Sequence, residues 1–384
     1  MSPGTLMLNS FNLKGPRKAL LFLALLAWLP SVVAQSAPKV TVLVPDPPGI
    51  SPFWTQTIEI MKAAAEDLEI SLRVAYSKSN SYSLKKDGLA ALNAKDRPDY
   101  FLTGYWIATT QHHLERAEQL DIRTFIFNSG IASEERSEVG QPRGKYKLWI
   151  GQMTPDELQA GYVLADILIN KAKAAGKTDN GKVHVVGLGG WGNKDEMEEN
   201  RYTGLRKRIN EQNDAVLGKL ALTGWVQVTA YEELLDALKQ FPKTGAVWSA
   251  SDLMALGAIE AVEHSGKVPG QDIFIGGMDW SRAGMDAVAA GKMVATLGSH
   301  FLEGAKTLIL VHDYHYGFDF AEEPGLVSQT QLRPVDTTNV EEYREKLNDL
   351  DWRQIDFKQF SKKYNRNLKD YDFSLDALLA TLKP

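Results

Sequence analysis

The sequence predicts an α/β protein made of two lobes, each a parallel β-sheet with helices on both faces. Short β-branched or aromatic runs alternate with longer segments of helical period, which is typical of parallel sheets covered by helices. The length of 384 residues allows two or three domains, since one domain takes roughly 100–200 residues. The strands fall into two sets, which fit two sheets better than one very wide sheet.

The first half of the chain opens with a strand expected at Val40–Val44. In the helix that follows, apolar residues recur at spacings of four and three, which places them on one face; they are Trp54, Ile58, Met61, Ala65 and Leu68. We expect further strands near Leu72–Tyr76, Tyr100–Thr103, Thr124–Phe127 and Leu148–Ile150, with helices near Ser83–Asn93 and Thr110–Gln119.

A long helix is expected from Pro155, a favourable first-turn residue, to about Ala174. After Pro334 the chain becomes polar and aromatic, and because disordered tails carry few aromatics we expect short helices packed on the main body. Between these segments we expect strands Val183–Gly187, Val216–Leu222, Ala246–Ser249, Ile273–Gly276 and Val294–Gly298, helices Asp195–Ile209, Tyr231–Gln240, Leu253–His264 and Phe301–Tyr316, and an extended stretch Gly325–Leu332.

The N-terminal segment has the pattern of a secretory signal peptide over residues 1–34. Lys14, Arg17 and Lys18 precede an apolar run, and small residues over 31–34 occupy the usual cleavage positions. A membrane anchor is the alternative, but the run is too short for a spanning helix of roughly 20 residues. We expect cleavage after Ala34 and export to the periplasm.

Composition excludes several classes of site. The chain has no Cys, so disulfides, zinc–thiolate sites, iron–sulfur clusters and thiol nucleophiles are excluded. A formal charge of -5 gives no global attraction for nucleic-acid phosphates. His312 and His315 could share a helix face, but no third ligand stands at a recognisable spacing. We expect no cofactor, no metal, no nucleic-acid partner and a monomer.

Residues 187–192 match the pattern GxGxxG between a predicted strand and a predicted helix, which is the context of a dinucleotide site. Trp191 inside the loop and the acidic residues that open the helix argue against a pyrophosphate there. An exported NAD-dependent oxidoreductase, or another small-molecule enzyme that uses this loop, stays open as the alternative. The chain has no GxSxG, HExxH or P-loop motif, which weakens the enzyme hypothesis.

Aromatic and planar polar residues follow the predicted strands, at the edge where an α/β sheet opens onto its ligand crevice. Aromatic faces stack on the C–H surfaces of sugars, while carboxylates and amides bond to adjacent hydroxyls. The alternative is that the tryptophans are core residues and that Asp252 belongs to a helix cap. The residues at these edges are Phe53, Trp54, Tyr105, Trp106, Asn128, Trp191, Asn193, Trp225, Ser251, Asp252, Asp279, Trp280, Ser299 and His300.

Residues 39–333 resemble the type 1 periplasmic solute-binding proteins, the ribose- and galactose-binding group. The resemblance rests on Val40–Val44 followed by Ser51–Trp54, on Arg201–Gly204, and on Ser251–Ala258 with Gly276–Asp279. It implies the periplasmic binding protein-like I fold, with two Rossmann-like lobes joined by three crossovers near residues 152, 300 and 327. The implied domains are 39–152 with 300–326, 153–299 with 327–334, and a docking extension over 335–384.

The resemblance also implies roles. Phe53 and Trp54 would clamp the ligand from the first lobe and Trp225 would stack from the second, while Asp279 accepts bonds from ligand hydroxyls and Arg201 donates to ligand oxygen. The full set of expected ligand-binding residues is Phe53, Trp54, Tyr105, Asn128, Trp191, Asn193, Arg201, Trp225, Ser251, Asp252, Asp279, Trp280 and His300.

Three positions depart from the usual pattern of sugar binders: Asn128 stands where Asp is common, Ser251 where Asn is common, and His300 near a usual Gln or Asn.

The insertion over 128–147 and the long tail look like the sensory branch that includes quorum-signal receptors. The expected function is a periplasmic protein, not an enzyme, that closes on a sugar-like ligand and presents it to an ABC transporter permease or a membrane sensor kinase. A repressor of the same fold would need an N-terminal helix-turn-helix, where this chain has a signal-peptide pattern.

Overall fold

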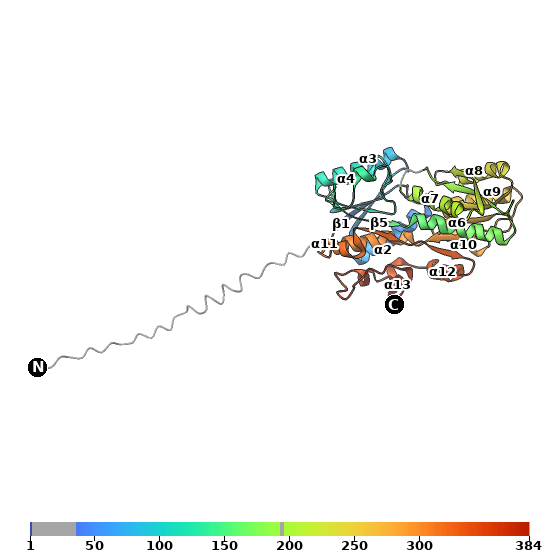
Figure 1. Cartoon of the computed structure of the whole chain (residues 1–384). Helices are drawn as coiled ribbons and strands as arrows, with labels where there is room; N and C mark the ends of the chain where they lie inside the picture. Colours follow the sequence, from blue (N-terminus) through green and yellow to red (C-terminus); the bar gives the residue numbers. More distant parts are fainter. Residues whose placement is uncertain (2–35, 193–195, 384) are drawn as a thin grey trace. The chain divides into compact units, whose positions relative to one another are not determined.

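The structure is a computed structural model that describes Met1 and residues 36–192 and 196–383 (Figure 1). The predicted signal peptide, apart from Met1, and the predicted site residue Asn193 lie outside the described residues. Among the residues described, no helix has the length and apolar character needed to span a membrane. The two predicted lobes are present, each with a six-stranded sheet.

The sheet of the first lobe has the strand order β2-β1-β3-β4-β5-β11, and all its pairs are parallel. The inner strands β1, β3, β4 and β5 are buried along almost their whole length, as expected where both faces are covered by helices, whereas the edge strands β2 and β11 are partly exposed. The strands are β1 Lys39–Val44, β2 Ser71–Tyr76, β3 Tyr100–Thr103, β4 Arg123–Phe127, β5 Trp149–Pro155 and β11 Val327–Thr330, and the helices are α2 Pro52–Asp67, α3 Ser81–Leu92, α4 Thr110–Leu120, α5 Arg136–Val139 and α11 Glu303–His315, with the short segments η1 His300–Leu302 and η2 Ala321–Gly325.

Alternate residues of a strand point to opposite faces, and β1 shows how this builds two cores in the first lobe. Val42 packs in the main core with α2, whereas Leu43 packs in a second cluster with Leu84 and Leu92 of α3. Helix α2 lies beside α11 and α3 beside α4, so each face of the sheet is covered by a pair of helices.

The sheet of the second lobe has the order β7-β6-β8-β9-β10-β12, in which only β12 is antiparallel to its neighbour. Helix α6 packs against α7, and α8 packs against α9. The strands are β6 Val183–Gly189, β7 Ala215–Leu222, β8 Thr244–Ser249, β9 Phe274–Met278, β10 Ala295–Gly298 and β12 Arg333–Asp336, and the helices are α6 Glu157–Ala174, α7 Glu196–Gln212, α8 Gln227–Gln240, α9 Asp252–His264 and α10 Arg282–Ala289.

Several details of this frame differ from what the sequence predicts. Pro155 ends β5 instead of opening the long helix, because the N-cap is Asp156, whose side chain accepts from the Gln159 amide. The sequence analysis places residues 327–334 in the second lobe. Residues 327–330 instead form β11, which pairs with β5 in the first sheet. The third crossover between the lobes therefore lies at residues 331–332. The first crossover follows the end of β5 at Pro155, whereas the sequence predicts it near residue 152, which lies inside β5. Helix α10 was not predicted at all.

The C-terminal extension, residues 337–383, forms the short packed helices expected from its aromatic content. In Figure 1 it lies beneath α2 and α10, and so touches both lobes. Helix α12 packs on α10, and η3 and η4 pack on α2. The elements are α12 Val340–Leu347, η3 Trp352–Gln354, η4 Phe357–Phe360 and α13 Leu375–Leu379, and the buried aromatic residues that anchor them are Trp352, Phe357, Phe360, Tyr371 and Phe373.

Candidate ligand-binding site

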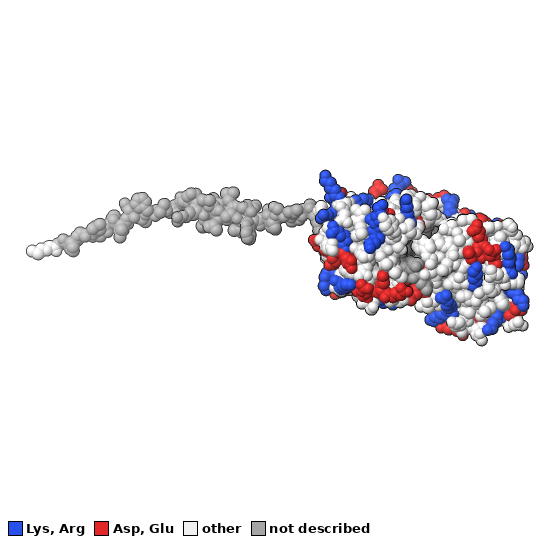
Figure 2. Space-filling model, turned by 90° about the horizontal axis from the view of Figure 1, so that it is seen from above, with Lys and Arg blue, Asp and Glu red and all other residues white. Residues whose placement is uncertain are grey.

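A cavity of about 540 Å³ is lined by residues of both lobes. The molecular surface is hollowed between the lobes, and basic and acidic side chains are interspersed over both (Figure 2). The lining residues come from segments that follow parallel strands of the two sheets, because the carboxyl ends of such strands meet at one edge of a sheet. Nine of the thirteen predicted site residues line this cavity: Phe53, Trp54, Asn128, Trp191, Arg201, Trp225, Ser251, Asp279 and His300.

The aromatic wall of the first lobe is built by the start of α2. The Ser51 hydroxyl accepts from the Trp54 amide at 3.3 Å, and Pro52 opens the helix, so the first turn is fixed beside the cavity. Phe53 stacks on the His300 ring with centroids 4.6 Å apart and planes at 22°. Trp54 meets Phe53 edge to face at 5.2 Å.

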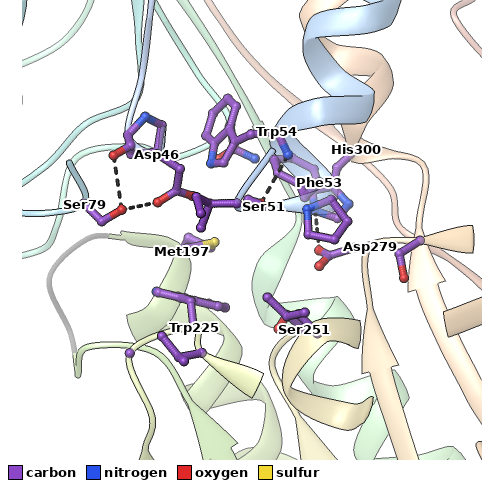
Figure 3. Close-up of a pocket in the computed structure, with 18 of the residues that line it drawn as sticks. Asp46, Ser51, Phe53, Trp54, Ser79, Met197, Trp225, Ser251, Asp279 and His300 are labelled. Carbon is purple, nitrogen blue, oxygen red and sulfur yellow. Dashed lines mark hydrogen bonds and ion pairs between the residues drawn. The ribbon is translucent and has the colours of Figure 1, made fainter. Parts of the chain in front are cut away.

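The opposite wall is Trp225 of the second lobe, which lies across the cavity from Phe53 and Trp54 (Figure 3). Its backbone has a φ of 64°, which a bulky residue rarely adopts. Gly190 makes this position possible, because a Cβ there would stand 2.1 Å from the Trp225 ring. The Gly-rich segment therefore makes room for an aromatic platform.

Asp279 supplies a carboxylate to the cavity at the end of β9. Its amide donates to the Leu297 carbonyl at 2.7 Å, and its Oδ1 lies 3.5 Å from His300 Nε2. Burial raises the pKa of Asp279 to about 7, although Arg201 opposes the change. Burial and the neighbouring Arg201 lower the pKa of His300 to about 3, so that imidazole is neutral. The site thus offers a carboxylate that titrates near neutral pH beside a neutral ring.

Arg201 reaches the cavity while bound on its other side to a buried carboxylate. Its Nη2 donates to Glu157 Oε1 at 2.8 Å and its Nη1 to the Ala250 carbonyl at 2.5 Å. Helices α6 and α7 must approach closely for this pairing, and Gly161 and Gly204 permit it: a Cβ at either would stand 2.1 Å from a backbone oxygen of the other helix. The bidentate pair fixes the guanidinium at the cavity wall.

Three residues of the expected ligand-binding set do not line the cavity: Tyr105, Asp252 and Trp280. The Tyr105 hydroxyl donates to Glu135 Oε2 at 2.6 Å inside the first lobe. Trp280 turns towards β12 and the extension: its Nε1 donates to the Arg333 carbonyl of β12 at 2.9 Å, and its ring meets Tyr343 of the extension with centroids 4.7 Å apart.

Asp252 is a buried brace beneath the cavity. Its Oδ2 accepts from the amide and hydroxyl of Ser281, both at 2.9 Å, and its Oδ1 accepts from the Thr296 hydroxyl at 2.7 Å. Burial raises the pKa of Asp252 well above the usual range. The carboxyl ties the start of α9 to the loop after β9 and to β10, so it positions the backbone that carries Asp279 without touching the cavity.

In each of these three cases the neighbouring residue faces the cavity: Trp106 beside Tyr105, Ser251 beside Asp252, and Asp279 beside Trp280. Sequence reasoning flagged Trp106 at the same edge but left it out of the expected set. Adjacent residues point in different directions, and the sequence alone does not say which of two plausible neighbours points inward.

Sequence reasoning also missed polar lining residues. Asp46 follows β1 directly, the same signal that was used for the other strands; its Oδ1 accepts from the Ser79 hydroxyl, and burial raises the pKa of Asp46. Arg282 and Asp286 lie on the unpredicted helix α10. The other lining residues that were not predicted are Pro45, Ile50, Ser51, Pro52, Ser79, Trp106, Ser129, Met197, Gly224, Val226, Leu253, Leu256, Ser281 and Ala283.

Two amides of the Gly-rich segment are already bonded to side chains of α7. The Gly190 amide donates to the Tyr202 hydroxyl at 2.8 Å, and the Trp191 amide donates to Glu198 Oε1 at 2.6 Å. A Cβ on Gly189 would stand 2.4 Å from the Tyr202 hydroxyl. These glycines allow close packing around Tyr202 and Trp225, and the two bonded amides are not available to a pyrophosphate.

Comparisons with known proteins agree with this geometry. Residues 41–310 match the family model described as periplasmic binding protein domain. The D-allose-binding periplasmic protein of Escherichia coli (strain K12) is 27% identical over 162 residues, 42% of this chain and 49% of that protein. The HTH-type transcriptional regulator MalR of Clostridium butyricum is 34% identical over 107 residues, 28% of each chain. The matches thus span about half or less of the length of these curated relatives.

A solved structure has a similar fold over almost its whole length. The periplasmic sugar-binding protein from Pseudomonas fluorescens superposes with a TM-score of 0.79 at 26% identity, covering 89% of this chain and 99% of that chain. The fold class and the family predicted from the sequence are confirmed. The chain belongs to the periplasmic binding protein domain family.

Proposed function

We propose that this protein binds a neutral, hydroxyl-rich ligand of the sugar class in the cavity between its lobes. The observation that carries the proposal is the pair of aromatic walls from opposite lobes, Phe53 and Trp54 against Trp225. Aromatic faces on two sides suit the C–H surfaces of a sugar ring. The names of the D-allose-binding relative and of the sugar-binding protein from Pseudomonas fluorescens support the same class.

The charges of the cavity favour a neutral ligand over an anionic one. Asp46 and Asp279 contribute carboxylates, and the guanidinium of Arg201 is already paired with Glu157. Arg282 is the other lining cation. Carboxylates accept hydrogen bonds from hydroxyl groups and repel phosphate or carboxylate groups on a ligand. Sugar phosphates and sugar acids should therefore bind worse than neutral sugars.

Ligand binding would bring the lobes together by hinge motion at the crossovers. A ligand that contacts Trp225 on one side and Phe53 on the other favours closure by its greater affinity for the closed state. The closed protein would then be recognised by a membrane partner, either an ABC transporter permease or a sensor kinase. The insertion and the extension, which resemble the sensory branch, favour the sensor.

We place the mature protein in the periplasm, exported by the signal peptide over residues 1–34 and cleaved after Ala34. Mass spectrometry of the N-terminus of protein recovered from the periplasmic fraction tests this. We further propose that the protein releases its ligand unchanged, as a binding protein and not as an enzyme. Titration with NAD and NADP, followed by fluorescence, tests the oxidoreductase alternative, which saturable binding of either nucleotide would support.

The ligand class is tested by measuring the melting temperature with neutral aldoses and ketoses, polyols, sugar phosphates, amino sugars and signalling furanones. A bound ligand raises the melting temperature by mass action. We expect a rise with a neutral sugar or sugar-like compound, and calorimetry then gives its affinity. A rise with a charged metabolite class alone, and with no sugar, would overturn the proposal.

The site is tested with Trp225→Ala. Loss of one stacking wall should weaken binding of the identified ligand by about 30-fold, which corresponds to about 2 kcal/mol. Tyr231→Ala is the matched control, because Tyr231 lies on α8, bonds to His264 at 2.7 Å and does not line the cavity. Equal affinities of wild type and Trp225→Ala for the ligand would contradict the assignment of Trp225 as a ligand-stacking residue.

A further inference from the structure

A second cavity, of about 250 Å³, lies at the third crossover between the lobes. None of the described residues lines both this cavity and the ligand cavity. The lining of the second cavity includes Lys306 of α11 in the first lobe, crossover and strand residues over 328–333, and residues 371–376 of the extension. We name it the hinge cavity. A ligand in it would contact both lobes and the extension.

Two cations line the hinge cavity without a bonded partner. Among the residues that the structure describes, the ammonium of Lys306 makes no hydrogen bond or ion pair. Its Nζ lies 5.7 Å from the centroid of the Phe373 ring. The side chain of Arg333, at the start of β12, likewise makes neither within the described ranges. Burial lowers the pKa of Lys306 to about 8, so the group is still charged near neutral pH.

Glu303 and Asp372 interact with Lys306 by charge and raise its pKa, which offsets burial only in part. Burial raises the pKa of Glu303, one turn before Lys306, to about 8, and its Oε1 accepts from the Thr330 hydroxyl. Asp372 accepts from the Ser374 amide at 2.9 Å, and Asp376 is paired with Lys346 at 2.9 Å. With Asp376 paired, the charges of Lys306 and Arg333 exceed that of Asp372 among the lining residues, so the hinge cavity carries excess positive charge and favours an anion.

We propose that the hinge cavity is a second binding site, which takes a small oxyanion, a phosphate or carboxylate group, between Lys306 and Arg333. Both side chains donate charge-assisted hydrogen bonds to such oxygens. Lys306 belongs to α11 of the first lobe and Arg333 to β12 in the second sheet, so the bound anion bridges the lobes at the crossover. Hinge motion changes the spacing of the two cations and therefore the affinity for the anion.

The test is equilibrium dialysis of the full mature chain with radiolabelled inorganic phosphate and, in a separate arm, with succinate, at ionic strength fixed with chloride. We expect saturable binding of at least one of them. Lys306→Gln and Arg333→Gln should each weaken that binding about tenfold, as the loss of one charge-assisted contact predicts. The arm that binds identifies whether phosphate or carboxylate is preferred.

Two control variants locate the bound anion. Arg282→Gln removes the cation of α10 that lines the ligand cavity, and Lys292→Gln removes a surface lysine paired with Glu263; both should bind the anion as wild type does. If Lys306→Gln does not fold, the test rests on Arg333→Gln alone. Arg333 is exposed, so we expect this substitution to leave the fold intact. No saturable binding in either arm, or unchanged binding in Arg333→Gln, would overturn the proposal.

Discussion

Two buried aspartates differ in the number of hydrogen-bond donors around the carboxylate: Asp279 at the ligand cavity and Asp313 under the C-terminal extension. Asp313 accepts from the Ser361 hydroxyl and the Lys362 amide, both at 2.5 Å, and from the Tyr371 hydroxyl at 2.8 Å. Asp279 has His300 Nε2 at 3.5 Å.

The donors set opposite pKa directions. Burial alone would raise the pKa of Asp313, but hydrogen bonds from His312, Ser361, Lys362 and Tyr371 outweigh burial and hold the pKa below its usual value. For Asp279 burial dominates and raises the pKa to about 7. The extension is thus docked by a carboxylate that accepts from several donors, whereas the carboxylate at the cavity has few donors within the protein, which fits its proposed role of accepting bonds from ligand hydroxyls.

The largest expected effect comes from Asp313→Asn. The amide cannot accept from the several donors that surround the carboxylate, so some are left buried and unsatisfied. We expect the free energy of unfolding to fall by about 4 kcal/mol, measured by denaturant titration at neutral pH. Asp279→Asn is the matched control and should not destabilise the protein there. Equal losses in the two variants would remove the distinction between docking and binding carboxylates.

The next largest effect is on the pH dependence of the free energy of unfolding, which should have opposite signs for Asp279 and Asp313. Because the folded-state pKa of Asp279 is raised, the folded protein binds a proton that the unfolded chain releases, and stability falls as pH rises towards about 7. The slope is at most about 1.4 kcal/mol per pH unit, so we expect wild type to lose about 2 kcal/mol relative to Asp279→Asn between about pH 5 and about pH 7. Denaturant titrations of both proteins across this range measure it.

For Asp313 the sign is reversed. Its lowered pKa gives stability that is present above the pKa of an unfolded aspartate and is lost as pH falls through the folded value. Wild type and Asp313→Asn should therefore converge in acid, while wild type and Asp279→Asn diverge towards neutral pH. A difference between wild type and Asp279→Asn that does not change with pH would contradict the raised pKa.

The smallest effect is expected from Tyr105→Phe. This variant loses the hydrogen bond to Glu135, which should cost about 1 kcal/mol of stability, and it should leave ligand affinity unchanged. Its neighbour Trp106 lines the cavity, so Trp106→Leu should weaken binding of the ligand found in the sugar panel. Calorimetry on the two variants measures this. Weaker binding in Tyr105→Phe than in Trp106→Leu would reverse the assignment of the pair.

Much of the frame and part of the site could be predicted from local pattern. Runs such as Val40–Val44 mark buried strands because their apolar residues are consecutive in the chain, and the residues that follow such strands share one edge of a sheet. Phe53, Trp225 and Asp279 were placed at the cavity by that reasoning. Helix α10 was missed although it is strongly amphipathic, because eight residues give too few turns for a periodic signal to stand out.

The sequence by itself determined the α/β alternation, the two lobes and the edges at which ligand residues gather, because hydrophobic period is a property of neighbouring residues. The tertiary structure decided which of two neighbours faces the cavity. Asp279 and Trp280 adopt φ values of 125° and 55°, and the brace from Asp252 to Thr296 joins residues 44 positions apart. It also decided that β11 joins the first sheet, because strand pairing is a contact between segments distant in the chain.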